Sequence, residues 1–124
     1  MEIGVSSYSY SWYIGKGKLD NLSVIAKAAE MGFEAIEYTV LPGETTEERF
    51  ALAAQIKAEV ARCGIELSAF LRGTTVGYGD AKTAQRLQIL KNTGYDGYVD
   101  IEFEGYEDCV EELAKGLAFY RSLS

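Results

Sequence analysis

One pattern recurs three times along the chain: a run with apolar residues at helical spacing, then a glycine, then a strand-like run. The glycines are Gly32, Gly64 and Gly94, which lie 32 and 30 residues apart. A glycine in this position is typical of a helix that ends in a left-handed residue before the chain re-enters a sheet. One strand and its helix take about 30 residues, and residues 3–8 supply one further strand. We therefore predict four such units in a single domain over residues 1–124.

The spacing of apolar residues predicts four helices: residues 19–31, one from residue 46, one from residue 80, and about 106–123. The second helix is expected to open at Thr46 with a cap and an acidic first turn, and Asp80 is expected to cap the third. The residues expected on the buried sides of the last three helices are Phe50, Leu52, Ala53, Ile56 and Val60; Ala84, Leu87, Ile89 and Leu90; and Val110, Leu113, Leu117 and Tyr120.

Composition excludes several classes of protein. Twelve basic and nineteen acidic side chains give a formal charge of −7, which argues against a nucleic-acid or anionic-membrane partner because both need excess lysine and arginine. The chain has no histidine. This excludes catalytic triads that depend on histidine and metal sites that use histidine ligands. Residues 1–4 lack the features of a signal peptide and no stretch is apolar enough to cross a bilayer, so we expect a cytoplasmic protein. Cys63 and Cys109 lack C-x-x-C spacing, so reduced structural thiols are expected.

Alternation within the predicted strands separates an apolar face from a polar one. In a parallel barrel one face of each strand meets the helices and the other meets the lumen. The set expected to face the helices is Ile3 and Val5; Ile36, Tyr38 and Val40; Ile65, Leu67 and Ala69; and Val99, Ile101 and Phe103. The set expected to face inward is Gly4, Ser6 and Tyr8; Ala35, Glu37 and Thr39; Glu66, Ser68, Phe70 and Arg72; and Asp100, Glu102 and Glu104.

The inward carboxylates are the candidate site residues. Glu37, Glu102 and Glu104 stand near the carboxyl ends of predicted strands, where (β/α) enzymes carry their chemistry. An unpaired buried charge costs several kcal/mol, so a purely structural strand has little reason to hold one there. The alternative is that these glutamates lie at an open, solvated rim or pair with Arg72.

Two stretches of the chain resemble the xylose-isomerase-like sugar phosphate isomerase/epimerase family. Residues 77–80 (GYGD), Leu90 and residues 94–105 (GYDGYVDIEFEG) look like its last helix, strand and helix. Residues 3–5 (IGV), 32–37 (GFEAIE) and 64–70 (GIELSAF) are similar to its first three strands. The family forms complete eight-stranded TIM barrels, so the resemblance implies a chain in which the middle strands are missing and the join falls within residues 71–76.

The resemblance also implies a chemistry. In that family a divalent metal is held by acidic residues and a histidine, and paired glutamates move protons beside a sugar carbonyl. Glu102 matches the metal-ligand glutamate of the final strand, and Glu37 matches an acidic pocket residue of the second strand. We accordingly name Glu37 and Glu102 as candidate catalytic residues, with Glu102 also the candidate metal ligand.

The length bears on assembly. A complete eight-stranded (β/α)₈ barrel usually takes about 200 to 250 residues, whereas 124 residues make a (βα)₄ half with exposed lumen and unpaired edges. Right-handed crossovers predict the third and fourth strands to be adjacent. We predict a homodimer that completes the barrel, with the fourth strand of each chain beside the first of the other and roughly 2,000 Å² or more buried. Two copies of Glu37 and Glu102 would favour Mg²⁺ or Mn²⁺.

Aromatic residues gather after the first strand, at Tyr8, Tyr10, Trp12 and Tyr13. Their rings can stack on a sugar and their hydroxyls can bond its oxygens; the alternative is that they seal the barrel mouth or the dimer seam. The candidate substrate-binding residues are Ser6, Tyr8, Trp12, Arg72 and Glu104.

Two functions remain open. The first is a truncated sugar isomerase or epimerase that acts on a small sugar or sugar phosphate, with Arg72 orienting the substrate. The second is a non-catalytic dimeric barrel or small-molecule binding module that retains the carboxylates. The retained Glu37 and Glu102 favour the first function, and the absence of histidine favours the second.

Overall fold

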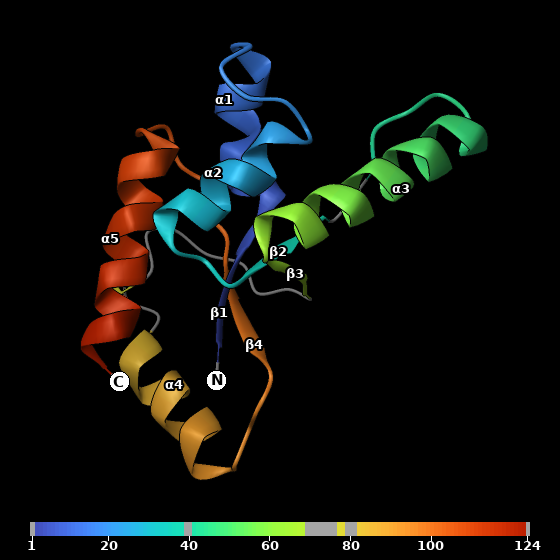
Figure 1. Cartoon of the computed structure of the whole chain (residues 1–124). Coiled ribbons are helices and arrows are strands. Elements are labelled where there is room, and N and C mark those ends of the chain that lie inside the picture. The colour runs from blue at the N-terminus through green and yellow to red at the C-terminus, as the bar shows by residue number, and fades with distance from the viewer. Residues whose placement is uncertain (1, 39–40, 69–76, 79–81, 124) are drawn as a thin grey trace.

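The computed structural model describes residues 2–38, 41–68, 77–78 and 82–123. Four parallel strands alternate with helices and form one sheet in the order β3-β2-β1-β4. Figure 1 shows α2 between α5 and α3. The elements are β1 (Glu2–Ser6), a 3₁₀ helix (Ser7–Tyr10), α1 (Ser11–Gly15), α2 (Ser23–Met31), β2 (Ala35–Glu37), α3 (Thr46–Cys63), β3 (Glu66–Leu67), α4 (Thr83–Asn92), β4 (Tyr98–Ile101) and α5 (Cys109–Ser122).

The strand order differs from the prediction. Strand β4 lies beside β1 and not beside β3. The paired residues run from Glu2 with Tyr98 to Val5 with Ile101. Strand β1 is the longest strand, and its last four residues are buried, which suits a central position in a parallel sheet. Strand β3 has two residues, both exposed. The prediction that β4 pairs with β1 of a second chain is therefore wrong, because β4 pairs with β1 of its own chain.

The repeated glycines end their helices as predicted. Gly32, Gly64 and Gly94 have φ values of 92°, 67° and 72°, in the left-handed region that favours glycine. The start of α3 is one residue from the expected cap, because Thr45 and not Thr46 caps it. The Thr45 side chain accepts from Glu48 N, and the Glu48 side chain accepts from Thr45 N, which forms a capping box.

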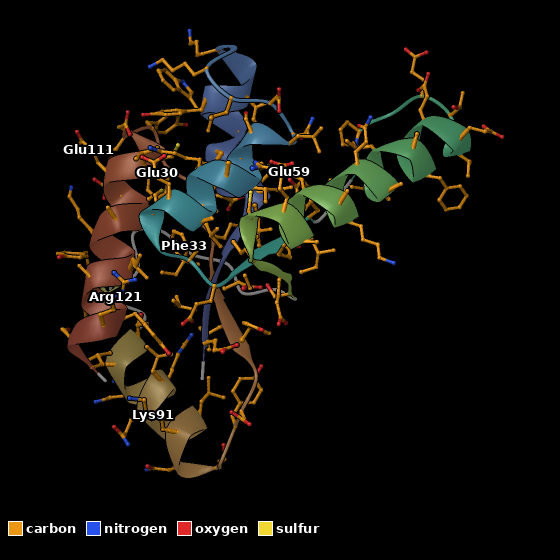
Figure 2. The ribbon with its side chains drawn as sticks, viewed as in Figure 1. Glu30, Phe33, Glu59, Lys91, Glu111 and Arg121 are labelled. Carbon is orange, nitrogen blue, oxygen red and sulfur yellow. The ribbon has the colours of Figure 1, made fainter. Side chains whose placement is uncertain are left out.

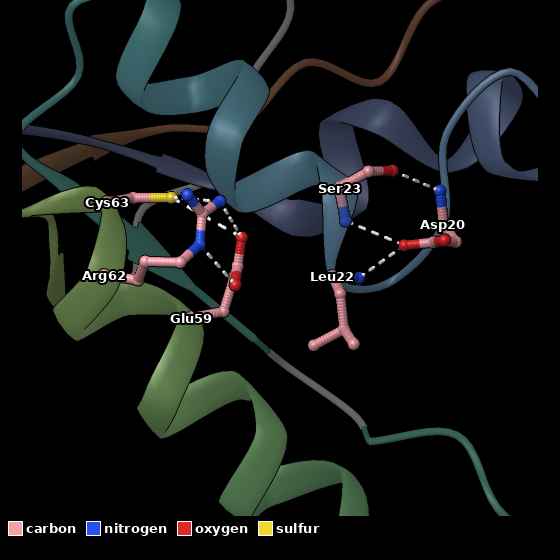
Figure 3. Close-up of polar contacts among 6 residues, drawn as sticks. All are labelled: Asp20, Leu22, Ser23, Glu59, Arg62 and Cys63. Atoms are coloured by element: carbon pink, nitrogen blue, oxygen red, sulfur yellow. Dashed lines mark hydrogen bonds and ion pairs between the residues drawn. The ribbon is translucent and has the colours of Figure 1, made fainter.

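The other helices begin later than predicted. In α2 the carboxylate of Asp20 accepts from the backbone N–H groups of Leu22 and Ser23, so the helix starts at Ser23 and not at residue 19 (Figure 3). Helix α4 starts at Thr83 after Lys82, which makes no side-chain cap, and Asp80 lies outside the described residues. Helix α5 starts at Cys109, where Asp108 accepts from Val110 N and Glu111 N.

Three helix positions that were predicted to be buried are exposed: Phe50, Ala84 and Ile89. Phe50 is 71% exposed and Ile89 is 61% exposed. The amino-terminal part of α3 extends beyond the sheet (Figure 1), so only Ile56 and Val60 of that helix are buried. In α4 only Leu87 is buried.

The apolar strand face packs under the helices as predicted for β1, β2 and β4, whereas Leu67 of β3 is 51% exposed, and Val40 and Ala69 lie outside the described residues. Ile3, Val5, Ile36 and Ile101 belong to one buried cluster with residues of α2, α3 and α5. The end of α5 is tied down by Arg121, whose Nη2 donates to Gly32 O at 3.2 Å, and Lys91 Nζ of α4 donates to Leu123 O at 2.9 Å (Figure 2). The core therefore lies on one side of the sheet.

The opposite, polar face is concave. Ser68 remains in the ladder, where its N–H donates to Ile36 O, yet its Oγ donates to both Asp100 oxygens, at 2.7 and 2.8 Å. Tyr98 Oη also donates to Glu66 Oε2, at 2.6 Å. Both contacts join β4 to β3 across β1 and β2, which in a flat sheet would hold them about 14 Å apart. The sheet must therefore curl around its polar face.

Gly4 of β1 makes room for this curl. A Cβ atom built at Gly4 would overlap Asp100 Oδ1 and lie 3.1 Å from Ser68 Oγ. Ala35 is the partner of Gly4 on β2 and is fully buried. Small residues at the centre of the sheet thus leave a trough, and side chains from the two outer strands meet in it.

Substituting Gly4→Ala should destabilise the fold by about 1–3 kcal/mol, because the new methyl group displaces the Asp100 carboxylate. The free energy of unfolding from urea denaturation measures the change. The matched control is Gly15→Ala, where a Cβ meets no atom within 4 Å, and a change within about 0.5 kcal/mol is expected. Equal stability of the Gly4→Ala variant and the parent chain would contradict the trough.

Candidate functional site

Buried polar groups collect at the carboxyl-terminal half of the concave face. Ser6 of β1 is the sheet partner of Glu37 of β2, and Ser6, Glu37, Asp100 and Glu102 are all buried. Alternation puts Glu102, two residues beyond Asp100, on the same side of the chain. Three of the predicted site residues, Ser6, Glu37 and Glu102, are therefore buried among the polar groups of this face.

The carboxyl group of Asp100 has a strongly raised pKa. Burial raises its pKa to about 6, the Ser68 hydrogen bonds act in the opposite direction, and the nearby charge of Glu37 raises the pKa further. A carboxyl group with a pKa near 6 is mostly ionised at neutral pH and still accepts a proton readily. Perturbed groups of this kind cluster at functional sites.

Glu37 contributes a carboxylate oxygen with unused hydrogen-bonding capacity. Its side chain is 6% exposed, and its Oε2 is buried without a hydrogen-bond partner among the described residues. A buried acceptor without a donor costs about 1–3 kcal/mol, and more when it is charged. The arrangement is stable when a ligand hydroxyl, a water molecule or a proton satisfies that oxygen.

Asp100 and Ser68 were not predicted as site residues. Alternation puts both on the inward face, but their contact depends on the curl of the sheet. The sequence signal that points to it is the small pair Gly4 and Ala35 at the centre of that face. Larger residues there would hold the outer strands apart.

A second hollow lies at the carboxyl ends of β1 and β4. Its volume is about 270 Å³, and it brings together three predicted substrate-binding residues, Tyr8, Trp12 and Glu104. Glu104 is exposed, as in the open-rim alternative. Ser6 lies outside this hollow, on the concave face, and Arg72 lies outside the described residues.

Hydrogen bonds hold the walls of this hollow together. Ser9 Oγ accepts from Phe103 N at 2.6 Å, which joins the 3₁₀ helix to the segment after β4. Tyr13 Oη donates to Asp108 Oδ2 at 2.6 Å, and this bond is the main reason that the pKa of Tyr13 is raised to about 12. The hollow is thus framed by two segments that the sheet brings together from opposite ends of the chain.

The aromatic cluster divides between core and surface. Tyr10 is fully buried, whereas Tyr8 and Trp12 are 47% and 52% exposed. Tyr13 packs against the core. Tyr10 is therefore a core residue, whereas the rings of Tyr8 and Trp12 are accessible to a ligand.

One chain does not fit a divalent metal. Among the described residues, no three His, Cys, Asp or Glu side chains lie close enough to hold a metal ion. The Mg²⁺ or Mn²⁺ site at Glu102 relies on carboxylates from a second copy and stays a prediction. Cys63 and Cys109 are free thiols, as expected, and burial raises the pKa of Cys109 to about 11.

No protein-family model, curated protein or solved structure matches this chain at a significant level. None of the described helices combines the length and apolar character needed to cross a membrane. Function is therefore argued from the geometry of the concave face and the hollow beside it.

The raised pKa of Asp100 gives a pH dependence of stability. A folded-state pKa of about 6 against an ordinary value of 3.8 means that the folded chain binds the proton more tightly. This contribution is fully present below pH 3.8 and is lost as the pH rises through about 6, with a size of up to about 3 kcal/mol.

Asp100→Asn keeps the hydrogen bond to Ser68 and removes this titration. The stability of Asp100→Asn relative to the parent chain should therefore rise between about pH 4 and about pH 8, measured as the urea unfolding free energy. The exposed substitution Asp96→Asn is the control and should leave the profile unchanged. A constant difference between Asp100→Asn and the parent chain across this range would contradict the assignment.

Proposed function

We propose that the chain is a small protein of the sugar isomerase and epimerase kind, in which the concave face moves protons beside the carbonyl of a small sugar. The observation that carries the proposal is the buried Glu37 Oε2, which has no hydrogen-bond partner among the described residues and lies near the perturbed carboxyl group of Asp100. A buried carboxyl group with a raised pKa, such as Asp100, next to a second buried carboxyl group is suited to general acid–base catalysis.

The proposed step needs one base and one acid. A carboxylate removes the proton from the carbon next to the sugar carbonyl, and the electron pair moves to form an enediol as the carbonyl oxygen takes up a proton from the second group. Isomerisation follows when the neighbouring carbon takes up a proton and the other enediol hydroxyl returns its proton to the second group. Epimerisation follows when the same carbon takes up a proton from the opposite face and the former carbonyl oxygen gives its proton back, so that both carboxyl groups end the cycle as they began. Glu37 on β2 and Asp100 on β4 flank β1, so they approach a ligand in the trough from two sides. Glu102, two residues beyond Asp100, is the third buried carboxyl group of this face.

The strand order supports the proposed resemblance to a barrel that has lost its middle. In a closed eight-stranded barrel the last strand lies beside the first. Here β4 lies beside β1, and β3 and β4 are the outer strands of the sheet. The missing strands of a complete barrel would stand between those two.

One observation favours the second candidate function, a non-catalytic binding module. Ser68 and Asp100, together with Tyr98 and Glu66, bond to each other across the trough and occupy the space that a substrate would need. A binding module uses the hollow at the strand ends and leaves the trough closed.

We also propose a homodimer in which β4 of one chain meets β3 of the other. Leu67 of β3 is 51% exposed, and an apolar hollow of about 250 Å³ lies beside it, between α3 and the β2–β3 edge. This hollow is an apolar surface next to an edge strand of the described sheet, and Phe50, which is also exposed, lies three residues before Ala53 of its lining. Pairing of β3 with β4 through a two-fold axis closes eight parallel strands and covers that surface.

The catalytic proposal is tested by proton exchange, which reports the chemical step without requiring net turnover. The protein is incubated with a panel of aldoses and ketoses in D₂O, and deuterium should replace the hydrogen on the carbon next to the carbonyl. The loss of that hydrogen signal is measured by ¹H NMR. Glu37→Gln and Asp100→Asn should each slow the exchange by about 10²-fold or more, and Glu102→Gln tests the third carboxyl group.

The control for this experiment is Glu47→Gln, on the exposed first turn of α3, which should exchange at the parent rate. Exchange that survives Glu37→Gln at the parent rate would contradict the proposed role of Glu37. Binding of a sugar without any exchange would support the binding module instead.

The dimer is tested by sedimentation equilibrium at micromolar concentration, where we expect twice the mass of one chain. Leu67→Asp and Phe50→Glu should shift the equilibrium to the monomer, because a charge would be buried in the interface. Glu30→Lys, at an exposed position of α2 between α3 and α5, is the control and should leave the dimer intact. A parent chain that remains monomeric would rule out the closed barrel.

A further inference from the structure

The hollow at the strand ends combines aromatic rings with carboxylates. Tyr8 and Trp12 present half-exposed rings, and Glu104 and Glu107 lie beside them in its lining. No lysine or arginine of the described residues lines it. The thiol of Cys109, also in the lining, is neutral at physiological pH because burial raises its pKa to about 11. The charge of the lining residues themselves is therefore negative, and the nearest lysines, Lys16 and Lys18, lie over the Trp12 ring.

The Trp12 ring already holds ammonium groups in this structure. Lys16 Nζ lies 5.4 Å from the ring centroid, and Lys18 Nζ lies 5.6 Å from it. Lys18 Nζ also lies 4.9 Å from the centroid of Tyr13. A cation over an aromatic face is attracted by the negative charge of that face, and tryptophan is the strongest such partner. The aromatic wall thus shows affinity for ammonium groups within its own chain.

The same hollow is unsuited to a phosphate. Helix α5 begins at its edge with Cys109, and a helix N-terminus can bind an anion through its free N–H groups. Here the carboxylate of Asp108 already accepts from Val110 N at 3.0 Å and from Glu111 N at 3.2 Å. Glu104 and Glu107 would repel a phosphate further.

We propose that this hollow binds a protonated amine carried on a small hydroxylated frame, that is, an amino sugar or amino polyol, in preference to a sugar phosphate. The ammonium group lies against the Tyr8 and Trp12 rings, where it takes the place of Lys16 or Lys18 at the Trp12 ring, with Glu104 and Glu107 as counter-charges. The hydroxyl groups of the ligand bond to the carboxylates and to Ser11. The volume of about 270 Å³ is at the small end for ligand sites, as one sugar ring requires. The hydroxylated frame rests on the proposed sugar function, whereas the amine rests on the hollow alone.

Calorimetric titration with glucosamine, glucose and glucose 6-phosphate tests the proposal, at a slightly acidic pH where the amine is protonated. Glucosamine should bind at least about tenfold more tightly than glucose, since it adds a cation–π contact and a charge-assisted hydrogen bond. Glucose 6-phosphate should not bind. Ethanolamine, which has an amine and one hydroxyl group but no ring, should bind more weakly than glucosamine and in competition with it.

The double variant Glu104→Gln, Glu107→Gln should lower the affinity for glucosamine to that for glucose. Both positions are exposed, and circular dichroism confirms that the variant is folded. Glu44→Gln and Glu47→Gln together, on the exposed start of α3, form the matched control and should keep the preference. Equal affinity of the parent chain for glucosamine and glucose, tighter binding of glucose 6-phosphate, or no binding of any of these compounds would overturn the proposal.

The failure of this proposal is distinguishable from failure of the catalytic one. If glucosamine and ethanolamine bind as expected and no sugar exchanges a proton, the amine site stands and the isomerase proposal falls. If neutral sugars exchange protons while glucosamine binds no better than glucose, the isomerase proposal stands and the amine site falls.

Discussion

The contact on which the rest of the structure depends is the one between Ser68 and Asp100 above Gly4. These two residues come from the outer strands of the sheet, and only the absence of a side chain at Gly4 lets them meet. The contact bends the sheet, and the bend removes Asp100 and its neighbours from water. Burial in turn raises the pKa of Asp100. The local chemistry of the site is therefore a consequence of the curvature of the sheet.

The sequence predicts those parts of the fold that short-range periodicity determines. The glycines at the helix ends, the two strand faces and the existence of four strand–helix units are all local properties, and the structure has each of them. The strand order was wrong because pairing is decided between distant segments. Strand β3 has two exposed residues, so it forms an edge, while the buried β1 takes the centre. The 3₁₀ helix and α1 were missed because neither is long enough to give a helical period.

The sequence predicts the candidate site residues that depend on local alternation and misses the one that depends on a distant contact. Glu37, Glu102 and Ser6 follow from alternation alone, and all three are buried. Tyr8, Trp12 and Glu104 follow from the rule that the carboxyl ends of parallel strands gather at one edge of a sheet, and they line one hollow. Asp100 was overlooked because its importance comes from a neighbour 32 residues away in sequence. That neighbour comes within reach only through the curl.

The curl and the closed barrel compete for the same groups. In the single chain two pairs of polar groups on this face bond to each other, Ser68 with Asp100 and Tyr98 with Glu66. A neutral hydrogen bond contributes a net free energy of about 1 kcal/mol, and one to a charged group contributes up to about 3 kcal/mol. Both are small beside the free energy gained when the apolar surface at the sheet edges is buried. If the edges pair between chains, β3 and β4 of one chain move apart and those carboxylates face the lumen. Association would then open the trough to a ligand, while the hollow around Trp12, built from β1 and β4 alone, would be present in either state.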